Sequence, residues 1–159
     1  MKAELMNRPQ QQSPQEYFRL LLVTVVGQAY AAAGYTLEER PMQWAGGQFR
    51  FSKPLENEQR HSIDYQLLAY TDTEWSSGMP SRFRVTLSRA DGVRRTLSAL
   101  VVEDFGVAIL PDADHWWTYR TTQELGHALA EAGHLVVGYG LGWLSGDLVP
   151  PADEHQASE

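Results

Sequence analysis

The sequence predicts an α+β fold, a two-layer sandwich in which two long helices cover one face of an antiparallel meander sheet of four or five strands. One segment near each end of the chain repeats apolar residues at helical spacing and begins with a helix-capping pattern. The segment between them alternates apolar and polar residues and is rich in turn residues. With 159 residues, 43% of them apolar, the chain is long enough to build one core.

The first helix is predicted over residues 14–33. Ser13-Pro14-Gln15-Glu16 forms a capping box with proline at the first helical position, and Gly34 ends the helix. The residues expected to face the sheet form one stripe: Phe18, Leu21, Leu22, Val25, Ala29 and Ala32. Leu20, Val23 and Tyr30 lie off this stripe, so much of the helix circumference is apolar. We therefore expect a second covering surface, either another helix of the chain or the partner in a homodimer formed through this helix.

Residues 20–26, followed by the small residues at 29–31, also resemble a signal region with a cleavage site. Glu4 and Glu16 lie where a signal peptide is positively charged, and the capping box favours a folded helix. Gly27 and Gln28 end the apolar run well before the ~20 residues that a membrane span needs. The sequence thus favours a cytoplasmic protein with no membrane association.

The strands of the meander follow the first helix. They are predicted over residues 35–44, 48–53, 61–71 and 81–89. The first two form a hairpin across Gly46-Gly47, and the fourth has the clearest alternation. In it, Phe83, Val85 and Leu87 point inward, whereas Arg82, Arg84, Thr86 and Ser88 point outward. The loop between the last two strands carries Trp75.

The second long helix begins at the capping box of residues 121–124. Its apolar residues recur at helical spacing and comprise Leu125, Ala128, Leu129, Ala132, Val136 and Tyr139. We expect it on the same sheet face as the first helix. Residues 97–102 suit a short helix or a strand, and the helix is favoured. The prediction is therefore a single domain over residues 13–149, with an N-terminal tail at 1–12 and an acidic tail at 150–159.

Charge disfavours nucleic acid and anionic membranes as partners, because 13 basic and 20 acidic side chains give a net charge of −7. The charge is uneven. Residues 1–95 hold twelve basic and ten acidic side chains, a net +2, whereas residues 96–159 hold one basic and ten acidic, a net −9. Five cations fall within fourteen residues: Arg82, Arg84, Arg89, Arg94 and Arg95. They either keep an exposed sheet face soluble or clamp an acidic partner or a phosphate.

Familiar catalytic patterns are missing from the sequence. Without cysteine there is no thiolate nucleophile, disulfide or cysteine-ligated metal. There is also no Gly-x-Ser-x-Gly elbow, no Gly-x-x-x-x-Gly-Lys loop and no His-Glu-x-x-His pair. One helix face carries Glu124, His127, Glu131 and His134 at the spacing of carboxylate-bridged metal sites. Its two histidines are ~10.5 Å apart along the axis, so a solvated face is favoured and neither metal nor cofactor is expected.

The most unusual composition lies in the loop before the second long helix, which contains Asp112, Asp114, His115, Trp116 and Trp117. Asp114 could orient His115 as a base, and a tryptophan could line a pocket or anchor a partner. Alternatively, one indole fills the end of the core while the other lies on the surface, and the aspartates favour the turn. Both interpretations stay open at this point.

Five short motifs in this order along the chain are similar to those of a known class of small domains. They are Gly34-Tyr35, Gly47-Gln-Phe-Arg-Phe51, Phe83-Arg-Val-Thr-Leu87, Trp116-Trp117 and Gly142-Trp-Leu144. This layout, over about residues 14–145, resembles a bacterial class of small α+β domains of unknown function. The resemblance implies the fold and no chemistry.

The sequence favours a non-enzymatic module that binds a protein or peptide through the exposed sheet face and the tryptophan-bearing loops. The residues expected to bind are Trp75, Arg82, Arg84, Arg89, His115, Trp116 and Trp117. The alternative is a small-molecule-binding protein or hydrolase-like enzyme. Its pocket would lie near Asp112, Asp114, His115 and Trp117. The sequence identifies no ligand for either function.

Overall fold

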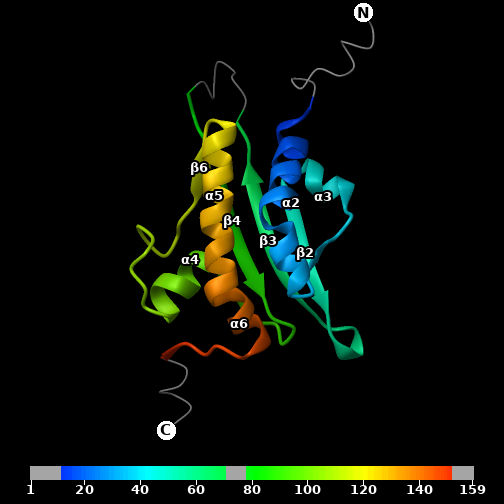
Figure 1. The fold of residues 1–159 in the computed structure, drawn as a ribbon, viewed down its shortest axis with the longest axis vertical. Coiled ribbons are helices and arrows are strands. Elements are labelled where there is room, and N and C mark those ends of the chain that lie inside the picture. The colour runs from blue at the N-terminus through cyan, green and yellow to red at the C-terminus, as the bar shows by residue number, and fades with distance from the viewer. Residues whose placement is uncertain (1–11, 71–77, 152–159) are drawn as a thin grey trace, which may run out of the picture.

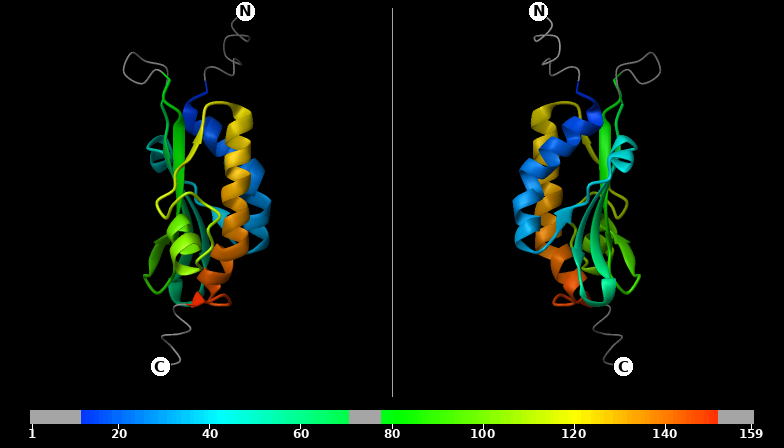
Figure 2. Two further views of the ribbon diagram at one scale, coloured as in Figure 1. Left: turned by 90° about the vertical axis from the view of Figure 1, so that its left-hand side faces the viewer. Right: turned by 90° about the vertical axis from the view of Figure 1, so that its right-hand side faces the viewer.

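A computed structural model describes residues 12–70 and 78–151, which form two layers (Figures 1 and 2). One layer is a six-stranded antiparallel sheet, and the other consists of two long helices side by side on one of its faces. The α+β prediction and the placement of both helices on one face are confirmed. Trp75 and nearly all of both predicted tails lie outside the described residues.

The sheet has six strands, whereas four or five were expected. Three of the six have only two or three residues, which is too short for an alternating pattern to be recognised. The strands are β1 (Thr36–Leu37), β2 (Gln48–Pro54), β3 (Arg60–Leu68), β4 (Ser81–Ser88), β5 (Arg94–Thr96) and β6 (Trp117–Tyr119). Their order is β1-β2-β3-β4-β5, and β6 also pairs with β4. One edge of β4 pairs with β3, and its other edge is divided between β5 and β6.

The two long helices are α2 (Pro14–Ala32) and α5 (Thr122–Leu135), and both begin where their capping residues predict. The Ser13 hydroxyl accepts a hydrogen bond from the Glu16 N–H at 3.0 Å, and the Thr121 hydroxyl accepts one from the Glu124 N–H at 3.1 Å. The shorter helical turns are α3 (Pro41–Ala45), η2 (Glu56–Glu58), α4 (Leu97–Ala99), η3 (Leu100–Asp104), η4 (Val136–Gly140) and α6 (Leu141–Ser145). The helix favoured over residues 97–102 is therefore confirmed.

The buried stripe of α2 differs from the prediction. Its buried residues are four apart and comprise Phe18, Leu22, Val26 and Tyr30, whereas Val25, Ala29 and Ala32 are exposed and Leu21 is half-buried. Tyr30 reaches the core because its hydroxyl bonds to that of Tyr65, with 2.6 Å between the oxygens. Val26 packs where Gly133 of α5 has no side chain, since a Cβ there would lie 2.7 Å from the valine. These two contacts fix the rotation of α2.

The predicted strand over residues 35–44 is wrong beyond Leu37. Only Thr36 and Leu37 pair with β2, and residues 41–45 form α3. Pro41 has no N–H to donate to a strand ladder, but it suits the first turn of a helix. The connection therefore passes through α3, which contacts both β2 and α2 and projects at this edge towards the face away from the long helices (Figure 2).

The core lies between the helices and the sheet. Phe18 is at its centre, with ring centroids 5.2 Å from Phe49 and 5.4 Å from Phe83. Inward-facing Phe83, Val85 and Leu87 of β4 are buried, which confirms the alternation predicted for that strand. Among the described residues, no helix is long and apolar enough to cross a membrane.

Candidate binding surface

The sheet face opposite α2 and α5 is polar, and we call it the open face. Among the residues that the strand register places on it are Gln48, Arg50, Ser52, Ser62, Asp64, Gln66, Arg82, Arg84, Thr86, Ser88, Arg94 and Thr96. Four of these residues are arginines and one is an aspartate, so the set carries a net charge of +3. The whole protein carries −7, which makes the open face a positive surface on an acidic protein.

Trp116 lies against two arginines of the open face. The guanidinium carbons of Arg82 and Arg84 are 4.7 and 4.8 Å from the centre of its ring. The Arg84 Nε donates to the Gln66 side-chain oxygen at 2.9 Å. Within the described part of the chain, the buried Nε of Arg82 has no hydrogen-bond partner. The two cations are therefore held beside a half-buried indole, an arrangement stabilised by cation–π attraction.

The adjacent residues Trp116 and Trp117 lie on opposite faces of the sheet. Trp117 is buried and stacks on Phe83 with ring centroids 5.7 Å apart. Trp116 lies on the open face, because successive residues of an extended chain point to opposite sides. The interpretation in which one indole fills the core and the other lies on the surface is confirmed.

His115 is not paired with a carboxylate of residues 12–70 or 78–151. Its ring meets Trp117 edge-on at 4.7 Å, and its backbone N–H donates to the Ser98 hydroxyl. Asp112 and Asp114 are exposed, and the Asp112 carboxylate accepts a hydrogen bond from the Asp114 N–H at 2.8 Å. In the described ranges no hydrogen bond joins the His115 ring to either aspartate, so the base suggested by the sequence is not assembled here.

The arginine cluster divides between two parts of the fold. Arg82, Arg84 and Arg94 share the open face, but Arg89 and Arg95 do not. Arg89 pairs with Asp91 at 2.8 Å in the turn after β4, and its guanidinium covers the buried Trp143. Arg95 lies opposite Leu87 on the core side of the sheet and pairs with Asp104 at 2.8 Å. Both make structural contacts instead of extending the open face.

The face of α5 that carries Glu124, His127, Glu131 and His134 is exposed along its length. The Glu124 carboxylate accepts a hydrogen bond from the Arg120 N–H, which completes the cap of the helix. Among residues 12–70 and 78–151, no group of three metal-ligating side chains comes together.

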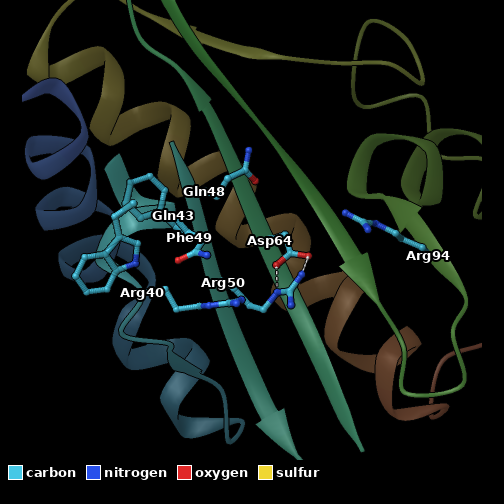
Figure 3. Close-up of a pocket in the computed structure, with 8 residues that line it drawn as sticks. Arg40, Gln43, Gln48, Phe49, Arg50, Asp64 and Arg94 are labelled. Atoms are coloured by element: carbon cyan, nitrogen blue, oxygen red, sulfur yellow. Dashed lines mark hydrogen bonds and ion pairs between the residues drawn. The ribbon is translucent and has the colours of Figure 1, made fainter. Parts of the chain in front are cut away.

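A pocket of about 170 Å³ lies where α3 meets the open face (Figure 3), and we call it the α3 pocket. Its lining residues are Arg40, Gln43, Trp44, Gln48, Phe49, Arg50, Asp64 and Arg94. Sequence reasoning missed it, because α3 was assigned to a strand and because the pairing of Arg50 with Asp64 follows from the register of β2 and β3. The tryptophan in Pro41-Met-Gln-Trp44, directly after a proline that does not suit a strand, is the one signal that the sequence offers.

His61, at the start of β3, makes the stability of the protein depend on pH. Its Nδ1 accepts a hydrogen bond from the Ala90 N–H at 3.0 Å, and burial together with nearby Lys53 lowers the pKa of His61 below the ordinary histidine value of 6.5. Because its pKa is lower in the folded protein, His61 becomes protonated at a higher pH in the unfolded chain than in the folded one. We expect the free energy of unfolding to decrease between about pH 7 and pH 5. Urea unfolding of H61N, which keeps an acceptor but does not titrate, should show a smaller decrease; an equal decrease in both proteins contradicts this role.

The chain matches no protein-family model, and neither a curated protein nor a solved structure is similar to it at a significant level. The resemblance to a bacterial class of α+β domains therefore stays an expectation. Evidence on function comes from the geometry and charge of the surface.

Proposed function

We propose that the protein is a non-enzymatic cytoplasmic module that binds an acidic segment of a protein or peptide on its open face. The observation that carries the proposal is the local net charge of +3, with Arg82 and Arg84 beside Trp116, on a protein of net charge −7. The cytoplasmic location is supported by the folding of residues 20–26, the signal-like run, within a helix of the core.

The contacts around Trp116 support a role in binding. Tryptophan and arginine are the side chains that most often carry binding energy at protein interfaces. Arg84 is already held by Gln66, so less side-chain freedom is lost when a carboxylate binds to it. The guanidinium groups can each donate two hydrogen bonds to a carboxylate.

A short acidic segment suits this surface better than a nucleic acid does. The excess of positive charge on the open face is local, and Asp112 and Asp114 are exposed in the same loop as Trp116. A long phosphate backbone that ran beyond the open face would meet these carboxylates and the rest of an acidic protein. A segment of a few acidic residues would contact the positive face alone.

Fluorescence anisotropy with a labelled decapeptide of alternating glutamate and serine tests the proposal. We expect binding that weakens as salt is raised and that falls about tenfold or more in the double variant R82Q/R84Q. R120Q, which removes one positive charge outside the open face, is the control and should bind nearly as the wild type does. Absence of binding, or equal binding by the double variant, contradicts the proposal.

A homodimer through α2 is a second part of the proposed function. Residues 20–37 contain no charged side chain, and Leu20, Val23 and Val25 are 53%, 42% and 38% exposed. An uncharged helix surface favours self-association in a protein whose other surfaces repel one another. We expect light scattering to give a dimer for the wild type and a monomer for L20K/V23K, whose substitutions are at exposed positions. A monomeric mass for both proteins refutes the dimer.

A further inference from the structure

The α3 pocket is enclosed by side chains from four separate elements. Arg40 precedes α3, Arg50 is on β2, Asp64 is on β3, and Arg94 extends from β5 towards β4 and the other charged groups (Figure 3). The position of α3 is supported by Arg19 of α2, whose guanidinium carbon is 4.6 Å from the centre of the Trp44 ring. The pocket is therefore formed by a helix and strands that pack against one another, and not by a loop.

The charges that line the pocket are not balanced. Its three arginines face one aspartate, which leaves an excess of two positive charges. Asp64 is fully engaged by Arg50, with Nε to Oδ1 at 2.6 Å and Nη2 to Oδ2 at 3.3 Å. Arg94 makes no ion pair with any described residue, and Arg40 makes one long contact of 3.5 Å, to Glu38. The pocket thus has two guanidinium groups available for an added anion.

Neutral donors add to this preference. The amides of Gln43 and Gln48 line the pocket together with the Trp44 indole. The Trp44 Nε1 is buried and has no hydrogen-bond partner in the described part of the chain. A buried donor without a partner is unfavourable, and an acceptor bound beside it removes that penalty.

The volume of the pocket limits what it can hold. About 170 Å³ is well below the roughly 300–1,000 Å³ of typical metabolite and cofactor pockets. A carboxylate or a phosphoryl group fits, but a whole nucleotide or sugar does not. An occupant of this size is a small free anion or the end of a side chain whose remainder lies outside the pocket.

We propose that the α3 pocket is an oxyanion subsite that receives the carboxylate or phosphoryl end of one side chain of the acidic peptide. Arg94 holds the oxyanion from the β5 side, Arg40 adds positive charge from the α3 side, and the Arg50–Asp64 pair lies between them (Figure 3). The identity of the ligand as a peptide rests on the proposed function, but the anion preference of the pocket does not.

Inorganic phosphate tests the pocket without a peptide. Phosphate is titrated at constant ionic strength while the indole N–H signals are followed by NMR, with the Trp44 signal assigned from W44F. We expect a saturable shift of the Trp44 signal, with an affinity about tenfold lower in R94Q and unchanged in R120Q. The absence of a saturable shift, or the same affinity in R94Q, overturns the subsite.

Three peptides then distinguish the two sources of the oxyanion. They share the glutamate–serine sequence above and carry glutamine, glutamate or phosphoserine at one central position. We expect the glutamate peptide to bind about tenfold tighter than the glutamine peptide. The phosphoserine peptide should bind tighter still, because its dianion matches the two excess positive charges of the pocket. Both gains in affinity should be lost in R94Q. A gain for one of the two alone assigns the subsite to that group. Equal binding of all three, or gains that persist in R94Q, overturns the subsite.

The experiments distinguish an error in the subsite from an error in the proposed function. If the peptides bind through Arg82 and Arg84 but are insensitive to R94Q, the open face is a binding surface and the α3 pocket is not part of it. If no peptide binds while phosphate still shifts Trp44, the pocket binds oxyanions and the peptide partner is wrong.

Discussion

Replacing Gly47 with alanine is expected to lower the free energy of unfolding by about 3 kcal/mol, the sum of a strained backbone and a steric clash. Gly47 has a φ of +83°, a conformation that L-residues rarely adopt. A Cβ at this position would also collide with the backbone carbonyl of Leu67. That carbonyl cannot easily move, because the Leu67 N–H donates to the Gly47 carbonyl at 2.8 Å. Urea unfolding monitored by circular dichroism measures the loss.

Gly92 provides the matched control. Its φ of +95° is similarly left-handed, but a Cβ there would meet no atom within 4 Å. G92A should therefore cost about 1 kcal/mol, from the backbone alone. If the two variants lose the same stability, the close approach at Gly47 is not the reason that glycine is needed.

F18A is expected to destabilise the protein by about 3–5 kcal/mol, a large share of the stability of a typical domain. Phe18 is completely buried and contacts aromatic rings of β2 and β4, so its removal leaves a cavity between the helix layer and the sheet. The same urea experiment measures the loss.

The control for this variant is L20A on the same helix. Leu20 is 53% exposed in the single chain. At a protein concentration low enough for light scattering to give a monomer, its truncation should therefore change the free energy of unfolding by no more than about 0.5 kcal/mol. A cost at Leu20 similar to that at Phe18 would contradict the assignment of the buried and exposed faces of α2.

Local signals predicted much of the fold. The hydroxyl caps at Ser13 and Thr121 located the starts of both long helices, and the alternation of Phe83, Val85 and Leu87 identified the inner face of β4. These features depend on residues close together in the sequence. Such patterns are set by backbone hydrogen bonding and by the period of the element itself.

The errors concern contacts between distant segments. The rotation of α2 depends on the bond of Tyr30 to Tyr65 and on the space that Gly133 leaves for Val26. Neither contact has a local signature, and burial of the tyrosine hydroxyls, which raises the pKa of both, follows from packing alone. A periodicity count gives weight to Ala29 and Ala32, yet these small side chains gain little from burial.

The candidate surface was likewise predicted in part. Arg82, Arg84 and Trp116 were identified from their alternation and composition, and the structure brings them together. The α3 pocket depends on which residues of β2 and β3 lie opposite one another and on where a five-residue helix packs. Pairing register and the position of a short helix are tertiary properties that no single stretch of sequence determines.

The central claim is that the open face of the sheet is the binding surface. The most direct test is to map amide and indole chemical shifts of the labelled protein during titration with the glutamate–serine decapeptide. We expect the largest changes at Gln66, Arg84 and the Trp116 indole, on the face away from α2 and α5. Changes centred instead on the outer surface of those helices, at Val25 and Val137, or no changes at all, would contradict it.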